Sequence, residues 1–411
     1  MKKFERSNNM LDRTRQIIPV CSQTFSKGYR YFPVGASPLF LRSGHGCKVV
    51  DLDQNVYIDY ILGLGPITLG YRYDAVDDAI YEQLASNGIV FSQPSDIEYQ
   101  LAKLLTDIIP GCEMARFFKT GTEACAASIR IARAFTRRDK ILSYGYHGWD
   151  SNFAVVTERK KGIPLSIGDN TLTFEYNNID SVKKAFDENH DQIACVIMEP
   201  VIGTVPENDF LHNIQDLCKK NSAVLIFDEV VTGFRWSLGG AGEYFGITPD
   251  ISVFGKGMGN GMPINAVCGR SDIMNEFEDV MVSSTFGGEC LSIAAALATI
   301  REMKKKNTIA HCWAMGKRLR AGLEKVGMRT QGYDCRPALI LPDDQKWKSL
   351  LLERLIEHGV MVHLGGLINI CYSHGEREID DTIKAFGAAL TEIKNGATLA
   401  GKIAYPSFRR V

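Results

Sequence analysis

The sequence has 411 residues, of which 45% are apolar and 23% are charged, enough chain for two or three globular domains. Lys and Arg number 47 against 48 Asp and Glu, so the formal net charge is −1, and this balance argues against a polybasic nucleic-acid-binding or membrane-surface protein. No apolar run approaches the roughly 18 residues of a membrane span, and no secretory signal pattern opens the sequence. We therefore expect a cytoplasmic protein with no nucleic-acid or membrane partner.

Cysteine and histidine usage bears on metal sites and disulfides. The eleven cysteines are scattered and never spaced CxxC, a pattern typical of reduced thiols and not of a disulfide framework or a zinc site. The eight histidines include no HExxH motif. The sequence therefore predicts no metal.

The expected elements begin with an irregular arm or short helix over the first thirty residues. A hairpin-like stretch follows over 39–60, with turns at 44–46 and 53–55. Apolar residues three and four positions apart then predict helices, and these cover residues 75–87, 97–108 and 123–136.

The middle of the sequence is typical of a parallel sheet. Two uninterrupted apolar runs, 194–198 and 223–227, have the length of strands buried on both faces. A helical pattern over 210–222 lies between them, which predicts a right-handed βαβ unit. A third run, 251–254, adds another strand.

After residue 300 the pattern becomes mixed. A long helix over 293–305 leads to strand-like ALILP and HGVMVHL segments and to a closing helix over 379–393. We predict an α/β fold with a large, mainly parallel sheet domain at 56–300. A smaller α+β C-terminal domain would cover 301–411, with residues 1–55 as an arm and hairpin belonging to it.

The first candidate site is KTGTEA at 119–124. Gly121 allows close backbone approach, and Thr120 and Glu123 have the spacing of a capping box. The N–H groups of a helix start, with two nearby hydroxyls, make a good phosphate cradle. Considered alone, a well-capped helix explains these residues as well.

The second candidate is Asp228 in FDEVVTGFR. It follows directly on an apolar strand, so its carboxylate lies at the edge of a low-dielectric core and needs a cationic or proton-donating partner. Glu229 would point to the opposite face. An ion pair with an arginine such as Arg235 and a ligand role both remain open.

The third candidate is Lys256 in FGKGMGNGMP. Glycines surround it, yet the segment lacks both the GxGxxG spacing of a dinucleotide loop and the GxxxxGK[ST] of a P-loop. A Schiff-base lysine is one interpretation, and a solvated loop lysine is the other.

Together the three candidates match pyridoxal phosphate (PLP). The phosphate of this cofactor needs a helix N-terminus, its pyridine nitrogen a carboxylate, and its aldehyde a lysine. Each need is met by a residue of the right type in a separate cluster.

The sequence resembles the class III, fold-type I aminotransferases, and among them most of all the glutamate-1-semialdehyde 2,1-aminomutases. The matching segments are ASPLFLRSGHGCKVVDLDQNVYIDY, FFKTGTEA, GYHGW, IMEP, LIFDEVVTGFR and TPDISVFGKGMGNGMPINAVCG. The resemblance implies a PLP-dependent aminotransferase with small-molecule amino donor and carbonyl acceptor, acting as a homodimer with its sites at the interface.

The resemblance also implies the roles of single residues. Lys256 would form the Schiff base and carry the proton, and Asp228 would pair with the pyridine nitrogen. Val230 would pack under the ring and Tyr146 would stack over it. Four further residues complete the set: Gly121 and Thr122 for the phosphate, Thr285 for the phosphate of the neighbouring subunit, and Arg30 for a substrate carboxylate.

Departures from the aminomutase pattern shape the expected reaction. Leu64 takes the place of a tryptophan, residues 157–169 form a short basic stretch in place of a long gating loop, and Gly288, Glu289 and Cys290 replace Gly-Asn-Pro. We expect ordinary transamination, with glutamate as donor and an aldehyde or ketone of a polar acceptor, such as a sugar acid in lipopolysaccharide-type amino-sugar biosynthesis. The aminomutase reaction is the alternative.

Overall fold

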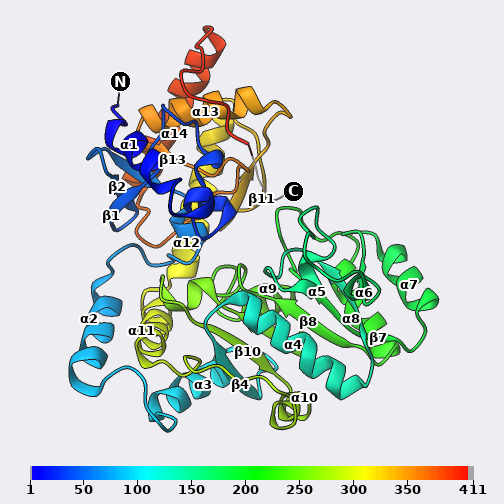
Figure 1. Cartoon of the computed structure of the whole chain (residues 1–411). Coiled ribbons are helices and arrows are strands. Elements are labelled where there is room, and N and C mark those ends of the chain that lie inside the picture. The colour runs from blue at the N-terminus through cyan, green and yellow to red at the C-terminus, as the bar shows by residue number, and fades with distance from the viewer. Residues whose placement is uncertain (1, 406–411) are drawn as a thin grey trace. The chain divides into compact units, whose positions relative to one another are not determined.

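The structure is a computed structural model that describes residues 2–405, and the chain forms two compact units (Figure 1). The large unit is Asp74–Lys306. The small unit joins the chain up to Tyr73 with the chain from Asn307. Strand β3 (Val56–Asp59) belongs to the small unit because it pairs with strands β2 and β13 there, whereas the sequence places residue 56 in the large domain.

The large unit is built on a seven-stranded sheet of order β4-β10-β9-β8-β7-β5-β6. The pairs from β9 to β6 are parallel, and β10 is antiparallel to both of its neighbours. The predicted mainly parallel sheet is confirmed. The strands are β4 (Met114–Phe118), β5 (Lys140–Tyr144), β6 (Thr171–Thr173), β7 (Ile193–Met198), β8 (Val224–Asp228), β9 (Ile251–Phe254) and β10 (Asn265–Gly269).

Helices connect these strands, as expected for α/β topology. Their bounds are α2 (Asp74–Glu82), α3 (Asp96–Ile108), α4 (Gly121–Thr136), α5 (Ser151–Ala154), α6 (Leu165–Gly168), α7 (Ile179–Glu188), α8 (Phe210–Lys220), α9 (Gly240–Phe245), α10 (Ser271–Met274) and α11 (Cys290–Lys306). Short π- or 3-10 turns add η5 (Gln83–Asn87), η6 (Lys256–Gly259) and η7 (Asn275–Glu278).

The two faces of the large sheet follow from the alternation of side chains along each strand. In β8, Val224 and Ile226 pack in a cluster with α4, whereas Leu225 and Phe227 pack in another cluster with α7 and α8. This explains why the strand is apolar at every position. Asp228, two residues after Ile226, therefore lies on the α4 face.

The small unit is an α+β structure around its own core. Its four-stranded sheet has the order β1-β2-β3-β13, with β1, β2 and β3 antiparallel and β13 parallel to β3. The turn predicted at 53–55 is confirmed between β2 and β3, whereas the turn predicted at 44–46 lies at 46–47, because residues 44 and 45 still belong to β1 and pair with β2. The strands of this sheet, besides β3, are β1 (Leu41–His45), β2 (Lys48–Asp51) and β13 (Val360–Met361), and a separate antiparallel pair is formed by β11 (Thr330–Tyr333) and β12 (Arg336–Leu339). The α-helices are α1 (Glu5–Thr14), α12 (Thr308–Lys325), α13 (Gln345–Glu357) and α14 (Glu376–Lys394). The short 3-10 turns are η1 (Pro19–Cys21), η2 (Phe25–Lys27), η3 (Tyr29–Tyr31) and η4 (Leu62–Leu64).

Two general properties can be compared with the sequence. Among residues 2–405, every helix is too short or too polar to cross a bilayer. The cytoplasmic location stays a prediction. All eleven cysteines lie within this range, each as a thiol, and ten of them are buried.

Candidate active site

The candidate residues gather at one edge of the large sheet. Asp228 ends β8, Lys256 follows β9 by two residues, and Tyr146 follows β5 by two. Parallel strands end at a common edge, which is where open α/β sheets bind ligands. Because β10 runs in the opposite direction, its first residue, Asn265, lies at the same edge, paired with Phe118 at the end of β4.

The start of α4 is the predicted phosphate cradle. Thr120 caps the helix: its Oγ1 accepts a hydrogen bond from the Glu123 N–H at 3.2 Å, and a Glu123 carboxylate oxygen accepts the Thr120 N–H at 2.9 Å. The predicted capping box is thus confirmed. The N–H groups of Gly121 and Thr122 belong to the first turn of α4, where a helix offers no carbonyl to its own N–H groups, and donors at a helix start suit an anion.

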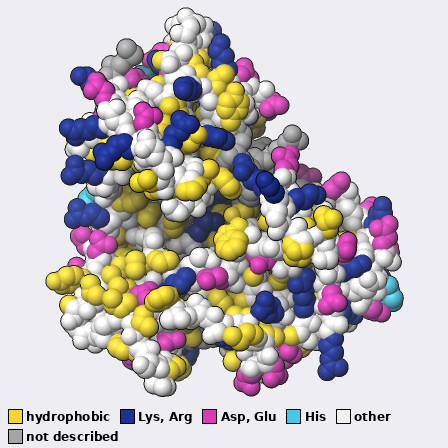
Figure 2. Space-filling model, in the orientation of Figure 1, with side chains coloured by type: hydrophobic (Ala, Val, Ile, Leu, Met, Phe, Trp, Pro, Cys, Tyr) yellow, Lys and Arg dark blue, Asp and Glu magenta, His cyan; other side chains and the backbone are white. Residues whose placement is uncertain are grey.

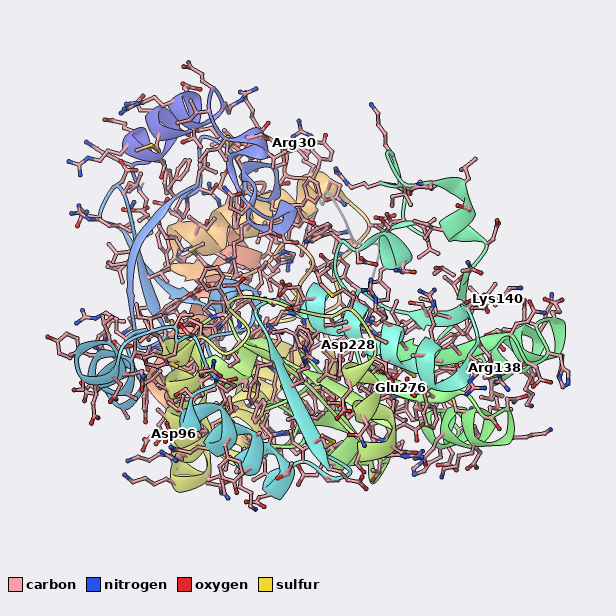
Figure 3. The ribbon with its side chains drawn as sticks, turned by 60° about the horizontal axis from the view of Figure 1, so that its bottom comes forward. Arg30, Asp96, Arg138, Lys140, Asp228 and Glu276 are labelled. Carbon is pink, nitrogen blue, oxygen red and sulfur yellow. The ribbon has the colours of Figure 1, made fainter. Side chains whose placement is uncertain are left out.

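Asp228 lies in a buried polar cluster beside α4 (Figure 3). Its Oδ1 accepts the Val230 N–H at 3.0 Å. Its Oδ2 lies 2.7 Å from Nδ1 of His147 and 3.5 Å from Sγ of Cys125. A carboxylate that is only 3% exposed thereby gains an imidazole, a thiol and a backbone amide as partners, which offset the cost of burying it.

Cys125 acts as a donor in this cluster. Burial and the neighbouring Asp228 carboxylate raise the pKa of its thiol well above the ordinary value, and the charge of Lys256 acts in the opposite sense. The sulfur, nitrogen and oxygen atoms of Cys125, His147 and Asp228 lie within 4.8 Å of one another. The raised pKa keeps the proton on the thiol, which is available for the contact with Asp228.

Glu229 points away from this cluster, as predicted. Its carboxylate accepts hydrogen bonds from the N–H groups of Ala241 and Gly242 at 2.8 and 2.7 Å and from the Thr232 hydroxyl. Burial raises the pKa of Glu229 to about 7. The side chain thus organises the loop after β8 and takes no part in the Asp228 cluster.

The segment after β5 places His147 against the start of α4. Tyr146 is 37% exposed, whereas His147 is 2% exposed and packs edge-on against Phe153. Gly148 has a φ of +105°, and a Cβ there would lie 2.0 Å from Oγ1 of Thr122. A glycine is therefore required for the segment to approach the helix start so closely.

Lys256 is half-buried and opens η6 with a φ of +37°. Its charge acts on the Cys125 thiol, so the amine belongs to the same electrostatic neighbourhood as Asp228. The two methyl carbons of Val230 lie 3.4 Å from the position that a Cβ of Gly121 would take. The side chain of Val230 is therefore close to the cradle.

Two further predicted site residues make no contact with the Asp228 cluster among the interactions described above. Thr285 is exposed in the segment just before α11. Arg30 belongs to the small unit, where its guanidinium donates to the Tyr29 hydroxyl at 3.3 Å and lies over the Tyr29 ring. The roles of both residues stay predictions.

Three residues at the site were missed by sequence reasoning: His147, Cys125 and Asn265. His147 stands in the GYHGW segment beside Tyr146, so a motif was present without a reason to assign the imidazole. Cys125 lies one helical turn after Gly121, and this spacing would have placed it inward. Asn265 begins a strand that the sequence did not indicate.

These residues fit PLP. The start of α4 offers two backbone donors for a phosphate, and the buried carboxylate of Asp228 can hold a protonated pyridine nitrogen. Nε2 of His147 and Oδ1 of Asn265 are buried and have no hydrogen-bond partner within residues 2–405. Both side chains can therefore still form a hydrogen bond to a ligand at this edge of the sheet. The fold and this site define a fold-type I PLP-dependent transferase.

Comparison with known proteins gives the family. The model of the family "Aminotransferase class-III" matches residues 31–376. The chain therefore belongs to the class III aminotransferases, and it is a PLP-dependent aminotransferase.

Curated relatives have different printed activities. A 3-aminobutyryl-CoA aminotransferase of Cloacimonas acidaminovorans is 35% identical over 95% of this chain and 98% of its own length. A glutamate-1-semialdehyde 2,1-aminomutase of Ruminiclostridium cellulolyticum is 39% identical over 74% of this chain and 73% of its own.

Solved structures share the fold. The PLP internal aldimine form of the FumI protein of Sphingopyxis sp. MTA144 has a TM-score of 0.90 at 26% identity, covering 97% of this chain and 99% of that one. An omega-transaminase of Sphaerobacter thermophilus has a TM-score of 0.87 at 24% identity, covering 94% and 98%.

Proposed function

We propose that this aminotransferase moves an amino group from an amino acid donor, glutamate, to an aldehyde or ketone of a polar acceptor such as a sugar acid in lipopolysaccharide-type amino-sugar biosynthesis. The observation that carries the amino-transfer chemistry is the buried carboxylate of Asp228. It is held by His147 at the same sheet edge as Lys256 and the start of α4.

Each residue would act through one group. The bound cofactor supplies an electron sink for the carbanion at the substrate Cα. Nζ of Lys256 would hold the cofactor covalently until the donor's amine displaces it. The freed amine would then take the proton from the donor's Cα and later return one to the former carbonyl carbon of the acceptor. Asp228 would keep a proton on the pyridine nitrogen, and His147 would hold Asp228 in the geometry this requires.

Positioning would fall to the residues around the cluster. The N–H groups of Gly121 and Thr122 would bind the phosphate. Val230 and Tyr146 would contact the two faces of the ring. Tyr146 is partly exposed, as expected for a side chain that packs against a ligand and not against the core.

The acceptor is inferred from the departures in sequence. Leu64, in η4 of the small unit, is smaller than the tryptophan of the aminomutases. Residues 157–169, between α5 and β6, carry three exposed cations in succession: Arg159, Lys160 and Lys161. With Arg30, which would bind a substrate carboxylate, these features favour an anionic acceptor.

The aminomutase reaction is the second candidate, and relatives such as that of Ruminiclostridium cellulolyticum favour it. A mutase must retain its diamine intermediate between half-reactions. The short 157–169 segment suits release of a keto acid better. Incubation of the holoenzyme with glutamate-1-semialdehyde and no other donor separates the two, because only a mutase forms 5-aminolevulinate.

The substrate test is a matrix of donors and acceptors. With glutamate as donor, we expect 2-oxoglutarate release in the presence of sugar-acid aldehydes or ketones. 3-Oxobutyryl-CoA belongs in the panel because a relative is named for the corresponding amine. Turnover of 3-oxobutyryl-CoA alone, or of glutamate-1-semialdehyde alone, would contradict the proposed acceptor class and leave amino transfer intact.

We also propose a homodimer with shared sites. Hydrophobic side chains gather over α2 and the start of α11 (Figure 2), where Tyr81, Leu84, Val90 and Phe91 are 71%, 47%, 44% and 50% exposed. Contiguous exposed apolar surface of this kind is typical of a protein interface.

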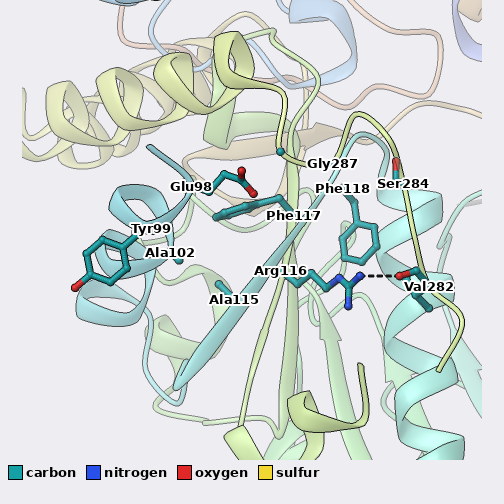
Figure 4. A pocket seen from close by; sticks show the side chains of 11 residues that line it. Glu98, Tyr99, Ala102, Ala115, Arg116, Phe117, Phe118, Val282, Ser284 and Gly287 are labelled. Carbon is teal, nitrogen blue, oxygen red and sulfur yellow. Dashed lines mark hydrogen bonds between the residues drawn. The ribbon is translucent and has the colours of Figure 1, made fainter. Parts of the chain in front are cut away.

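A cavity of about 360 Å³ has Ser284, the residue before Thr285, in its wall (Figure 4). It lies between α3, β4 and the segment 282–288. In its wall Arg116 donates a hydrogen bond to the Val282 carbonyl at 2.6 Å, which fixes the segment just before Thr285. A partner docked here would bring its own site close to this turn, and Thr285 would reach the phosphate bound by the partner.

Mixed dimers test this arrangement. Lys256→Ala and Thr285→Ala chains, each weakly active alone, are co-expressed with different tags, and the hybrid is purified. If Thr285 serves the neighbouring site, the hybrid has one complete site and recovers about half the wild-type activity. If it serves its own chain, no hybrid site is complete and activity stays low.

A further inference from the structure

The carboxamide of Asn265 is a polar group at the site edge with no assigned role. Asn265 is 5% exposed, and its Oδ1 is buried without a hydrogen-bond partner within residues 2–405. An unsatisfied buried amide costs free energy in proportion to its lost solvation. Such groups are few in native structures, and a ligand that completes the hydrogen bonds accounts for one of them.

Two glycines fix where this carboxamide lies. A Cβ on Gly255 would stand 1.8 Å from Oδ1 of Asn265, and a Cβ on Gly121 would stand 3.7 Å from the same atom. The amide therefore lies between the residue before Lys256 and the first residue of α4. The alternation along β10 agrees, because Val267, two positions on, packs with α4.

We propose that Asn265 is a further ligand of the cofactor's phosphate, donating a hydrogen bond from Nδ2 opposite the N–H groups of Gly121 and Thr122. This inference rests on the proposed function only in placing the phosphate at the start of α4. A half-turn of the carboxamide exchanges Oδ1 and Nδ2, so the group can present two N–H donors to an anion. The helix start supplies donors from one side and β10 from the other.

The chemistry favours a phosphate over other occupants. A phosphate dianion accepts several hydrogen bonds at each oxygen, and hydrogen bonds to a charged acceptor are about twice as strong as neutral ones. An amide adds a donor without adding charge. Because the amide lies against Gly255, no side chain fits at position 255. The glycine therefore keeps the amide in contact with the backbone just before Lys256.

The test compares two ligands that differ only in the phosphate. Apo-protein is titrated with PLP and with pyridoxal, and binding is followed by absorbance and by intrinsic fluorescence. For Asn265→Ala we expect the Kd for PLP to rise about ten- to hundredfold, with the Kd for pyridoxal within about twofold of wild type. Asn265→Asp, which puts a carboxylate near the phosphate, is expected to weaken PLP binding further.

The outcomes separate the alternatives. Equal weakening of PLP and pyridoxal would place the amide on the ring or on Lys256, and unchanged affinity for both would make it structural; either overturns the proposal. Asn265→Ser, which keeps a shorter donor, replaces the alanine variant if that protein does not fold. Thr122→Ala, which removes a hydroxyl at the phosphate cradle and keeps the backbone N–H, is measured in parallel: if it weakens PLP and spares pyridoxal while Asn265→Ala changes neither, the phosphate site stands and only Asn265 fails.

Ser252→Ala is the matched control. Ser252 is also buried and lies in the neighbouring strand β9. It alternates with Ile251 and Val253, which pack with α4, so its side chain points to the other face of the sheet. This variant is expected to leave the affinities for both PLP and pyridoxal unchanged.

Discussion

Each unit of the molecule buries an aspartate at the end of a strand, with a cysteine and a histidine close by, and the two arrangements differ in what the carboxylate holds. In the small unit, Asp59 ends β3 and accepts the N–H groups of Ile61 and Leu62 and the Tyr71 hydroxyl. In the large unit, Asp228 ends β8 and binds His147 and Cys125 directly. The first carboxylate fixes backbone, and the second fixes an imidazole.

The two histidines show the same contrast. His374 stacks on Tyr60 at 4.5 Å and binds the N–H and the sulfur of Cys371, and burial lowers its pKa to about 3. It is thus a neutral packing residue. His147 contacts a carboxylate that also lies close to Cys125 in the first turns of α4. Residue types alone do not separate structure from function, whereas their neighbours do.

The largest expected effect is the loss of activity when the Asp228 carboxylate is replaced, and the same replacement at Asp59 provides the comparison. Asp228→Asn should lower kcat/KM by about a thousandfold, because an amide cannot hold a protonated pyridine nitrogen, while the melting temperature changes little. Asp59→Asn should lower the melting temperature and leave the absorbance spectrum and the Kd of bound PLP unchanged. Steady-state kinetics and thermal melts check both. A spectral change in the Asp59 variant would break the contrast.

His374 should make the stability of the small unit pH-dependent. Its folded pKa lies near 3, below the unfolded value of 6.5, so below pH 6.5 the unfolded chain binds a proton that the folded chain does not. Stability is therefore lost as pH falls, by about 2 kcal/mol between pH 6.5 and 5. His374→Phe should remove this part of the slope. Urea unfolding at several pH values measures it, and equal slopes in both proteins would refute a neutral His374.

Glu229 should give the opposite slope in the large unit. Its folded pKa of about 7 lies above the unfolded 4.5, so between these values the folded chain holds a proton that the unfolded chain has lost. Its contribution to stability is full below pH 4.5 and falls as pH rises to 7, by about 1.4 kcal/mol per pH unit. Glu229→Gln should flatten the curve in this window, although the lost hydrogen bonds lower stability at every pH. Hydrogen exchange of peptides from the large unit isolates the effect.

His147 should have the smallest effect of the set. His147→Phe removes the hydrogen bond to Asp228 and should lower kcat/KM about tenfold. It should also shift the pH at which the bound cofactor's visible band titrates, because the charge facing the pyridine nitrogen is less well held. His374→Phe is the matched control and should leave that titration where it is. A shift of equal size in both variants would count against a special role for His147.

Local patterns in the sequence predict much of this architecture. Strands β7, β8 and β9 are continuous apolar runs because both of their faces are covered, and Asp228, Lys256 and Gly121 stand directly beside such patterns. The contact between His147 and Asp228 joins residues 81 positions apart and depends on β5 and β8 lying on either side of β7 in the sheet. The strand β10 is short and follows a glycine-rich loop, so neither its direction nor the position of Asn265 could be predicted.

The proposed chemistry depends on a covalent bond between the amine of Lys256 and PLP beside Asp228. The direct test is to reduce the holoenzyme with borohydride, digest it, and locate the pyridoxyl group by mass spectrometry, with Lys220→Ala as a control on the exposed end of α8. We expect the added mass on the peptide containing Lys256 and its absence from Lys256→Ala protein. Label on another lysine, or on none, would contradict it.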